Sequence, residues 1–158
     1  MNLFKTFIFT LVVPATVAIY VPYWLLSSRP VPTPPGALRY LGLLPLFVGA
    51  CIYLWCAWNF AVVGRGTPAP IDPPKELVVE GPYRYVRNPM YVGVLLALVG
   101  EALYFGSRAL IWWALAVCVW VNLFVLLYEE PTLRRKFGAA YDEYCARVPR
   151  WLPRRVKG

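Results

Sequence analysis

Long apolar stretches separated by short polar connections dominate the chain, and four of them approach the length of a membrane crossing. They cover residues 3–26, 38–63, 89–105 and 109–128. A hydrocarbon core about 30 Å thick needs about 20 apolar helical residues per crossing, so the third stretch is the short one. The pattern predicts an all-α fold: a polytopic transmembrane bundle of about four helices, forming a single membrane domain over residues 1–158.

Composition supports lipid as the surrounding solvent. Charged residues make up 15% of the chain, whereas soluble domains carry about 25%. The first stretch is longer than the apolar run of a signal peptide, and no small-residue cleavage site follows it, so we expect it to remain as a helix. Pro14 and Pro22 lie within it. They predict a kink, because neighbouring helices in lipid can satisfy the carbonyls that proline frees.

The positive charges are placed unevenly and predict the topology. The net charge is +8, and with four crossings 13 of the 16 Lys and Arg residues fall on one face, leaving Arg29, Arg39 and Arg108 on the other. The positive-inside rule then puts both termini and the connection 64–88 in the cytoplasm, as expected for a bacterial inner membrane protein. No basic-aromatic recognition motif points to nucleic acid, so we expect the basic face to attract anionic membrane lipids.

Histidine is missing from the sequence, and the four cysteines form no CxxC pair. We therefore expect no metal site and no disulfide framework. Hydrolase chemistry of the serine type would also lack its base.

The first polar connection ends in a helix-start signal. Residues 66–74 are proline-rich and predict an extended loop. Asn88 can cap the helix that follows, and Pro89 at its first position has no amide hydrogen to leave unpaired. With Arg84 and Arg87 close by, this helix start would receive an anion. An ordinary cap beside ordinary positive-inside arginines explains the same residues equally well.

The second polar segment begins with Glu129 and Glu130, two adjacent carboxylates at a helix end where they repel one another. In one reading, Glu130 caps a new helix starting at Pro131 and pairs with Arg134. In the other, which we favour, the two carboxylates receive a cationic or hydroxyl-rich ligand. Downstream, apolar residues recur at helical spacing and predict a cytosolic amphipathic helix, either an anchor or a lid: Leu133, Phe137, Tyr141, Tyr144 and Val148.

Glu101 is a carboxylate inside the third apolar stretch. An ionisable residue at such depth is a candidate for function. It lies only a few residues from the outer turn, so we favour a structural or solvated role.

Three ordered segments, from about Lys75 to Pro153, resemble the isoprenylcysteine carboxyl methyltransferase family and its phospholipid methyltransferase relatives. The first holds Leu77-Val78, Gly81-Pro82-Tyr83 and Arg87-Asn88-Pro89-Met90-Tyr91-Val92-Gly93, similar to the family's Arg-His-Pro-x-Tyr-x-Gly signature. The second is Glu129-Glu130-x-x-Leu133, and the third runs from Phe137-Gly138 through Tyr141, Tyr144 and Val148-Pro149-Arg150. The resemblance implies a membrane methyltransferase that uses S-adenosylmethionine.

The resemblance also implies where the cofactor lies, namely at the cytosolic membrane boundary. By motif position, its binding residues would be Lys75, Glu76, Leu77, Val78, Tyr83, Asn88, Pro89, Met90, Tyr91, Gly93, Glu129 and Glu130. Candidate catalytic residues are Tyr91, Glu130 and Arg150, and the acceptor would be a lipophilic small molecule bearing a carboxylate or an amine. Many members carry histidine where this chain has Asn88, and asparagine cannot exchange a proton near neutral pH.

Two rival functions remain open at this point. Membrane reductases of sterols and other isoprenoids share a related helical core and use NADPH, although the chain has no Gly-x-Gly-x-x-Gly fingerprint. A non-catalytic membrane subunit is the other rival. The acceptor and the oligomeric state cannot be predicted from these motifs.

Overall fold

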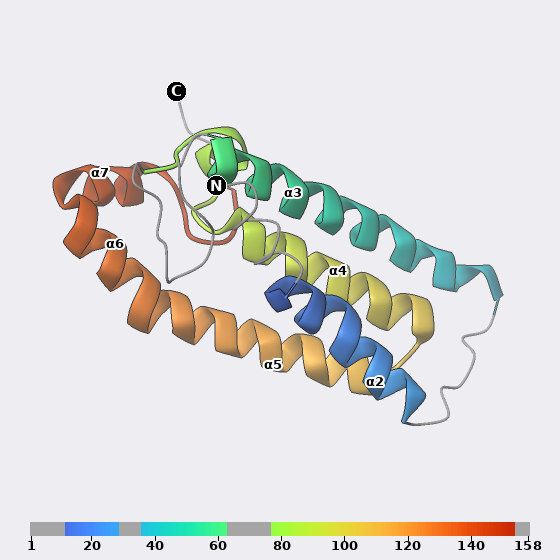
Figure 1. Cartoon of the computed structure of the whole chain (residues 1–158). Helices are drawn as coiled ribbons and strands as arrows, with labels where there is room; N and C mark the ends of the chain where they lie inside the picture. The colour runs from blue at the N-terminus through green and yellow to red at the C-terminus, as the bar shows by residue number, and fades with distance from the viewer. Residues whose placement is uncertain (1–11, 29–35, 63–76, 154–158) are drawn as a thin grey trace.

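The structure, a computed structural model, describes residues 12–28, 36–62 and 77–153, with the side chains of 60–62 left aside. Within these ranges every regular element is helical, as the sequence predicts. Four apolar helical segments run side by side, and two short helices follow at one end (Figure 1). The elements in chain order are a π-helical turn Thr16–Tyr20, α2 Val21–Ser27, a 3-10 helix Gly36–Gly42, α3 Leu43–Val62, a 3-10 turn Gly81–Arg84, α4 Pro89–Phe105, α5 Arg108–Phe124, a π-helical turn Val125–Glu129, α6 Glu130–Phe137 and α7 Ala139–Arg147.

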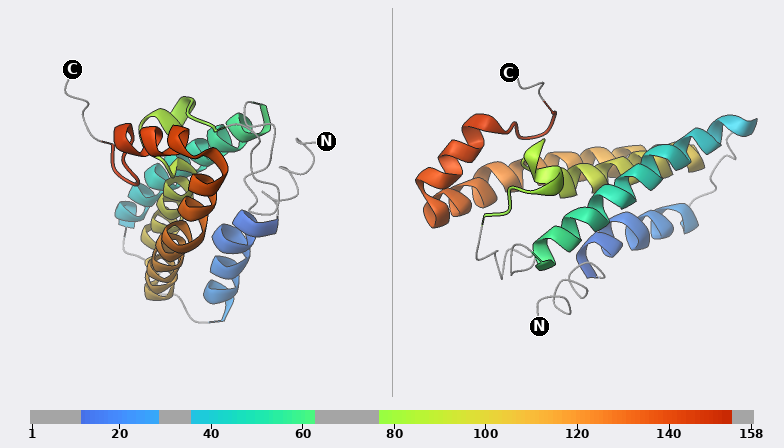
Figure 2. Two further views of the ribbon diagram at one scale, coloured as in Figure 1. Left: turned by 90° about the vertical axis from the view of Figure 1, so that its left-hand side faces the viewer. Right: turned by 90° about the horizontal axis from the view of Figure 1, so that it is seen from above.

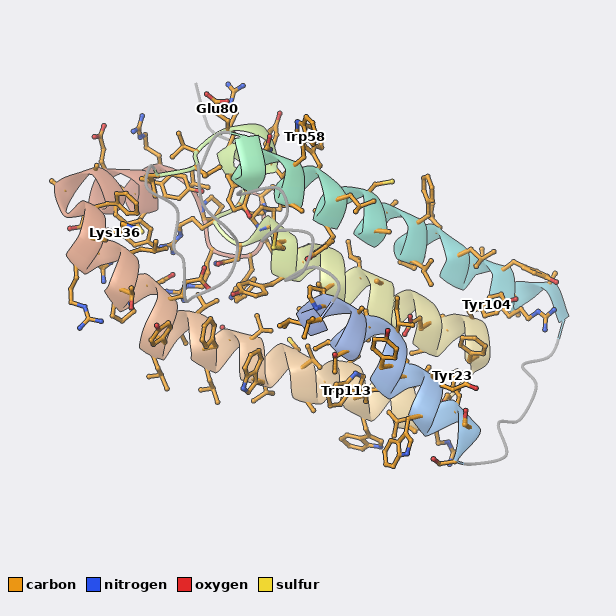
Figure 3. All side chains as sticks on the ribbon, viewed as in Figure 1. Tyr23, Trp58, Glu80, Tyr104, Trp113 and Lys136 are labelled. Atoms are coloured by element: carbon orange, nitrogen blue, oxygen red, sulfur yellow. The ribbon has the colours of Figure 1, made fainter. Side chains whose placement is uncertain are left out.

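The N-terminal helix is irregular between its two prolines. The turn Thr16–Tyr20 is π-helical, and the amide of Val21 donates to the carbonyl of Thr16, five residues back. The same spacing would pair the Val17 carbonyl with Pro22, which has no amide hydrogen. Trp113 of α5 donates its indole Nε1–H to that Val17 carbonyl at 2.9 Å, and Figure 3 shows Trp113 beneath the N-terminal helix. A neighbouring helix therefore satisfies the carbonyl that proline leaves free.

Helices α3 and α4 approach closely through glycines. A Cβ atom added to Gly49 of α3 would lie 2.4 Å from the carbonyl oxygen of Gly93 on α4. Seven residues after Gly93 on α4, a Cβ on Gly100 would lie 2.6 Å from the carbonyl oxygen of Gly42. Small residues that let two backbones touch are typical of helix pairs in membranes, where apolar side chains gain little by leaving lipid.

Helices α4 and α5 form a tight antiparallel hairpin. Gly106 adopts a left-handed conformation after α4, and Ser107 accepts a hydrogen bond from the Leu110 amide at the start of α5. Facing residues of the two helices then form an apolar core: Leu98, Ala114, Val117, Val121 and Val125. The bounds of α4 match the third predicted stretch, 89–105.

The outer faces of the helices remain apolar and exposed. Phe47, Leu54, Trp112 and Leu127 are among many large hydrophobic side chains left uncovered. Among the described residues, Gly36–Asn59 and Arg108–Phe137 are long and apolar enough to cross a bilayer, and Val12–Ser27 and Pro89–Phe105 are shorter apolar helices. An apolar surface this extensive marks a membrane-facing molecule.

The segment after α5 forms two helices where the sequence pattern predicts one. Gly138 separates α6 from α7 with φ 53° and ψ −130°, a conformation that favours glycine. Tyr141, Tyr144 and Val148 of the expected apolar face pack with Leu77 and neighbouring side chains of the chain itself. This face is thus partly covered by the protein.

Candidate functional site

Two segments far apart in sequence meet at one end of the bundle, which we call the polar end: residues 77–91, before and at the start of α4, and residues 129–151, after α5. Figure 2 shows α7 and the chain that follows it beside the 77–88 connection in both views. Glu80 and Lys136 both lie at this end, whereas Tyr23 and Tyr104 lie at the other (Figure 3). The contacts between the two segments define the candidate site.

The start of α4 is held by the C-terminal segment. Asn88 occupies the N-cap position, but its side chain caps no amide of α4. Its amide Nδ2 instead donates to the carbonyl of Arg150 at 3.3 Å, and the Arg87 amide donates to the Pro149 carbonyl at 2.9 Å. The predicted capping role of Asn88 is therefore wrong: its side-chain oxygen accepts no hydrogen bond from the first turn of α4, and its side chain links to the C-terminal segment instead.

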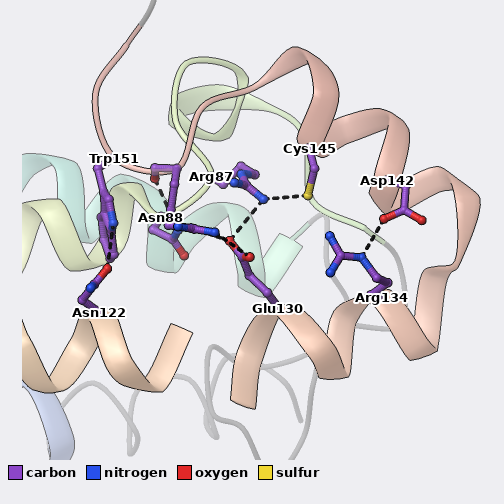
Figure 4. A network of polar contacts seen from close by, with 9 residues as sticks. Arg87, Asn88, Asn122, Glu130, Arg134, Asp142, Cys145 and Trp151 are labelled. Carbon is purple, nitrogen blue, oxygen red and sulfur yellow. Dashed lines mark hydrogen bonds and ion pairs between the residues drawn. The ribbon is translucent and has the colours of Figure 1, made fainter. Parts of the chain in front are cut away.

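Glu130 is the centre of a charged cluster. It is only 7% exposed, and Arg150 donates to both of its oxygens, Nε to Oε1 at 2.7 Å and Nη2 to Oε2 at 2.9 Å. Arg87 Nη1 lies 3.1 Å from Oε1 and also donates to Cys145 Sγ at 2.6 Å. Figure 4 shows Arg87, Glu130 and Cys145 converging from three parts of the chain. Bidentate geometry and a second guanidinium make this a strong, charge-assisted link.

The pairing of Glu130 with Arg134, which was the less favoured of the two readings, is not formed. Arg134 Nε instead lies 2.7 Å from Asp142 Oδ1 on α7, on the exposed surface. Helix α6 begins at Glu130 itself, and no side chain caps it. The hydrogen bond to Asp142 raises the pKa of the Arg134 guanidinium, which stays charged at any physiological pH.

Glu129 lies in the π-helical turn that joins α5 to α6. Tyr91, in the first turn of α4, donates its hydroxyl to Glu129 Oε2 at 2.8 Å. Among the described residues, Glu129 makes this one hydrogen bond, whereas the carboxylate of Glu130 contacts two arginines. π-helical turns inside α-helices recur at functional sites, where they re-aim a side chain.

Two buried tyrosines, Tyr83 and Tyr144, link the two segments at the polar end. The Tyr144 hydroxyl of α7 donates to the backbone carbonyl of Tyr83 at 2.7 Å. Tyr83 packs in an apolar cluster with Val78 and Met90 against Tyr53 of α3. Burial raises the pKa of the phenols of both Tyr83 and Tyr144, so these groups are neutral and the region around them is dry.

The structure brings most of the predicted residues together. At the polar end lie Leu77, Val78, Tyr83, Asn88, Pro89, Met90, Tyr91, Glu129, Glu130 and Arg150. Gly93 is one turn further along and faces α3, where its missing Cβ allows the contact with Gly49. Lys75 and Glu76 lie outside the described residues.

Three residues that contact the site were not predicted from the sequence: Asn122, Cys145 and Trp151. The Trp151 indole donates to the Asn122 amide oxygen at 3.2 Å, and Cys145 contacts Arg87 across the segments. These pairs are separated by 29 and 58 residues, so no local pattern reveals them. Their effect is to fix the chain after α7 against both α4 and α5.

The polar end has donors and acceptors suited to a zwitterionic ligand. The Nε atom of Arg87 is buried and has no hydrogen-bond partner among the described residues, as expected of a donor reserved for an anion. At the same end, the Glu129 carboxylate accepts a hydrogen bond from the Tyr91 hydroxyl and could receive a cationic group. The described residues contain no group of three His, Cys, Asp or Glu side chains that could hold a metal ion.

Comparison with known proteins identifies the family of the chain. The family of phospholipid methyltransferases matches residues 38–140, more than half of the chain, so the chain belongs to the phospholipid methyltransferase family. It is 40% identical over 81 residues to protein-S-isoprenylcysteine O-methyltransferase B of Arabidopsis thaliana, covering 49% of this chain and 40% of that protein. The resemblance found in the sequence is confirmed.

Other relatives carry different names. Over 125 residues the chain is 30% identical to the nickel-cobalt-cadmium resistance protein NccN of Alcaligenes xylosoxydans xylosoxydans, covering 75% of this chain and 51% of that protein. Over 72 residues it is 38% identical to methanethiol S-methyltransferase 2 of Bradyrhizobium diazoefficiens, covering 46% and 27%. The chain thus spans about half or less of these relatives' lengths. No solved structure matches it significantly.

Proposed function

We propose that the protein transfers a methyl group from S-adenosylmethionine to a lipophilic acceptor at the membrane surface. The observation that carries this proposal is the joining of residues 77–91 to residues 129–151 over one end of an apolar helix pair, through Tyr91–Glu129 and the Glu130 cluster. Relatives named as methyltransferases of isoprenylcysteine and of methanethiol support the reaction class.

The cofactor would lie between the two segments. The free Nε–H of Arg87 would receive its carboxylate, and Glu129, oriented by Tyr91, would receive its ammonium or ribose hydroxyls. Glu130 and Arg150 would hold the segments together as positioning residues, because their charges already satisfy one another. Tyr83, Met90 and Tyr144 are buried there and would wall the adenosyl group.

S-adenosylmethionine supplies an electrophilic methyl on its sulfonium. Its transfer is an in-line displacement that needs alignment and the exclusion of water more than acid–base groups. The buried tyrosines provide that dry surround, and a protein without histidine can support it. A carboxylate acceptor arrives already ionised, whereas an amine acceptor would lose its proton to a carboxylate such as Glu129.

Topologically, we propose four membrane crossings with the polar end and both termini in the cytoplasm. The four apolar helices lie side by side (Figure 1), and 13 of the 16 Lys and Arg residues lie toward the polar-end face in that topology. Helix α4, with 17 residues, would span about 26 Å. The acceptor would reach the site laterally from the bilayer.

Calorimetry with S-adenosylhomocysteine tests the site in the full chain reconstituted in lipid nanodiscs. Tyr91→Phe and Glu129→Gln each keep the shape of the side chain and remove a polar contact. We expect each to weaken binding about tenfold, the cost of one charge-assisted hydrogen bond. Tyr85→Phe and Glu143→Gln, at exposed positions of the same two segments, are the matched controls.

Unchanged affinity in both Tyr91→Phe and Glu129→Gln would overturn the site assignment. If the wild-type protein failed to bind S-adenosylhomocysteine while NADPH raised its thermal stability, the reductase function would replace the proposal. Methyl-labelled cofactor incubated with the protein and a membrane lipid extract would then identify the acceptor.

A further inference from the structure

An apolar groove lies beside the α4–α5 core and shares Val94 with it. The groove has a volume of about 330 Å³ and is lined by the N-terminal helix, α3 and α4, with Ala18, Leu46, Ala50, Tyr53, Ala97 and Glu101 among its lining residues. Cavities that bind small molecules begin at about 300 Å³. The groove is therefore large enough for one slender ligand.

One end of the groove adjoins the polar end. Tyr53 lines the groove and also packs in the cluster that contains Tyr83 and Met90. Gly93, one turn into α4, lines the same end. A ligand in the groove would thus have its first atoms beside the proposed cofactor pocket.

At the other end of the groove lies Glu101, the one charged side chain among the described residues that line it. Glu101 is eight residues beyond Gly93 on α4, which corresponds to about 12 Å along the helix axis. Its Oε2 atom is buried and has no hydrogen-bond partner among the described residues. A buried polar atom without a partner costs free energy, so it requires an explanation.

Solvation and an ion pair are the ordinary explanations for a carboxylate at this depth. The sequence position of Glu101 favours a structural or solvated role, and its side chain is half-buried, but its Oε2 atom is buried. Arg39, in the 3-10 helix before α3, donates to the Tyr40 hydroxyl at 2.9 Å and lies over the rings of Tyr40 and Tyr104. No ion pair of Glu101 is formed within the described part of the chain.

We propose that Glu101 recognises the far end of the lipophilic acceptor. The acceptor would be a single apolar chain that fills the groove from Gly93 to Glu101 and ends in a hydrogen-bond donor, a hydroxyl or an ammonium group. This inference rests on the proposed function, since it assigns the apolar part of that acceptor to the groove. It makes Glu101 a specificity residue about 12 Å from the reacting end.

A photoreactive long-chain alkyl amine tests the inference by binding alone. The full-length protein in nanodiscs is labelled, and the modified peptides are mapped by mass spectrometry. Labelling should fall on the groove residues of α3 and α4. Unlabelled decylamine and 1-decanol should compete for it at least about tenfold more strongly than decane, because each donates a hydrogen bond to a buried carboxylate.

Three variants and one control variant sharpen the result. Glu101→Leu should abolish the advantage of both donors over decane, whereas Glu101→Gln should reduce the advantage of the amine and keep that of the alcohol. Ala50→Leu should fill the groove and suppress labelling, and Ala116→Leu, at an exposed position of α5, should leave labelling unchanged.

Labelling outside the groove, equal competition by decane, or a donor advantage that survives Glu101→Leu would each overturn the inference. Binding of S-adenosylhomocysteine measured in the same samples separates this result from the proposed function. If the cofactor binds and the groove fails these tests, only the role of Glu101 falls. If the groove passes and the cofactor does not bind, the methyltransferase proposal falls instead.

Discussion

Glu101 lies within the apolar helix α4 and Glu130 lies at the start of α6, and the structure surrounds the two carboxylates in opposite ways. At the polar end, two arginines from different segments surround Glu130, and three hydrogen bonds or ion pairs of 2.7–3.1 Å satisfy it. On α4, the Oε2 atom of Glu101 is buried in an apolar groove and has no hydrogen-bond partner in the part of the chain that the structure describes. A carboxylate whose oxygens are paired, like Glu130, stabilises the fold. A buried oxygen without a partner, like that of Glu101, is what a ligand could satisfy.

The regions around the two carboxylates also differ in the kind of contact that holds them together. The polar end depends on hydrogen bonds between segments, whereas the α3–α4 pair beside the groove depends on backbone contact at Gly42, Gly49, Gly93 and Gly100. Changes to the polar end should therefore loosen the C-terminal segment and the cofactor site. Changes to the glycine contact should separate the helices.

The largest expected effect comes from Glu130→Leu. It leaves Arg87 and Arg150 without their shared partner, and breaking a buried ion pair costs about 3–5 kcal/mol. The free energy of unfolding, measured by denaturant titration in mixed micelles with tryptophan fluorescence, should fall by about that amount. Arg134→Ala, which removes an exposed ion pair to Asp142, should cost less than about 1 kcal/mol. Equal losses in the two variants would show that the Glu130 cluster is not a special link.

Gly49→Val should have the next largest effect. Its Cβ would stand 2.4 Å from the Gly93 carbonyl and 2.7 Å from the Ala97 amide, so the helices must move apart. Overpacking of this kind costs about 1–3 kcal/mol. Thermal unfolding in nanodiscs reports it, and Ala116→Val on the exposed face of α5 is the control. A Gly49→Val protein as stable as the control would contradict the close α3–α4 contact.

A smaller effect is expected from Tyr144→Phe, which removes the hydrogen bond to the buried Tyr83 carbonyl. The loss should be about 1–2 kcal/mol at neutral pH, and hydrogen exchange of α7 should speed up. The exposed Tyr85→Phe is the matched control and should change neither quantity.

The same tyrosines predict a dependence on alkaline pH. Burial raises the pKa of Tyr83 and Tyr144 in the folded protein, whereas in the unfolded chain a phenol ionises near pH 10. Their contribution to stability is full below about pH 10 and is lost as the pH rises toward the folded-state values. A stability curve that is flat above pH 10, or as steep in Tyr144→Phe as in wild type, would contradict this account.

The smallest effect on stability is expected from Glu101→Leu. Removing a buried polar atom that has no partner leaves no unpaired group behind, so stability should stay within about 0.5 kcal/mol or rise. The contrast with Glu130→Leu, under the same denaturant titration, measures the difference between the two carboxylates directly. A loss of several kcal/mol in Glu101→Leu would mean that this residue has a structural role.

Much of the fold could be predicted because its signals are local. The pair Asn88-Pro89 and Gly106 mark the bounds of α4, and the irregular N-terminal helix follows from Pro14 and Pro22. The break at Gly138 was missed, since the apolar spacing continues across it even though glycine permits the turn.

The hydrogen-bond and ion-pair partners within the site could not be predicted in the same way. Glu130 finds Arg150, 20 residues away, in preference to Arg134 on the next turn, because the fold returns the chain across the polar end. Asn88 likewise gives its side chain to a carbonyl 62 residues away. Motif order indicated that the two segments belong together, but only the three-dimensional arrangement shows which atoms join them.

Hydrogen–deuterium exchange with and without S-adenosylhomocysteine tests most directly whether the two segments form one cofactor pocket. The protein in nanodiscs should show slower exchange in residues 77–91 and in residues 129–151 together, with no change at the opposite end around Tyr104. Protection of one segment alone, or of neither at a saturating concentration, would contradict a shared adenosyl pocket.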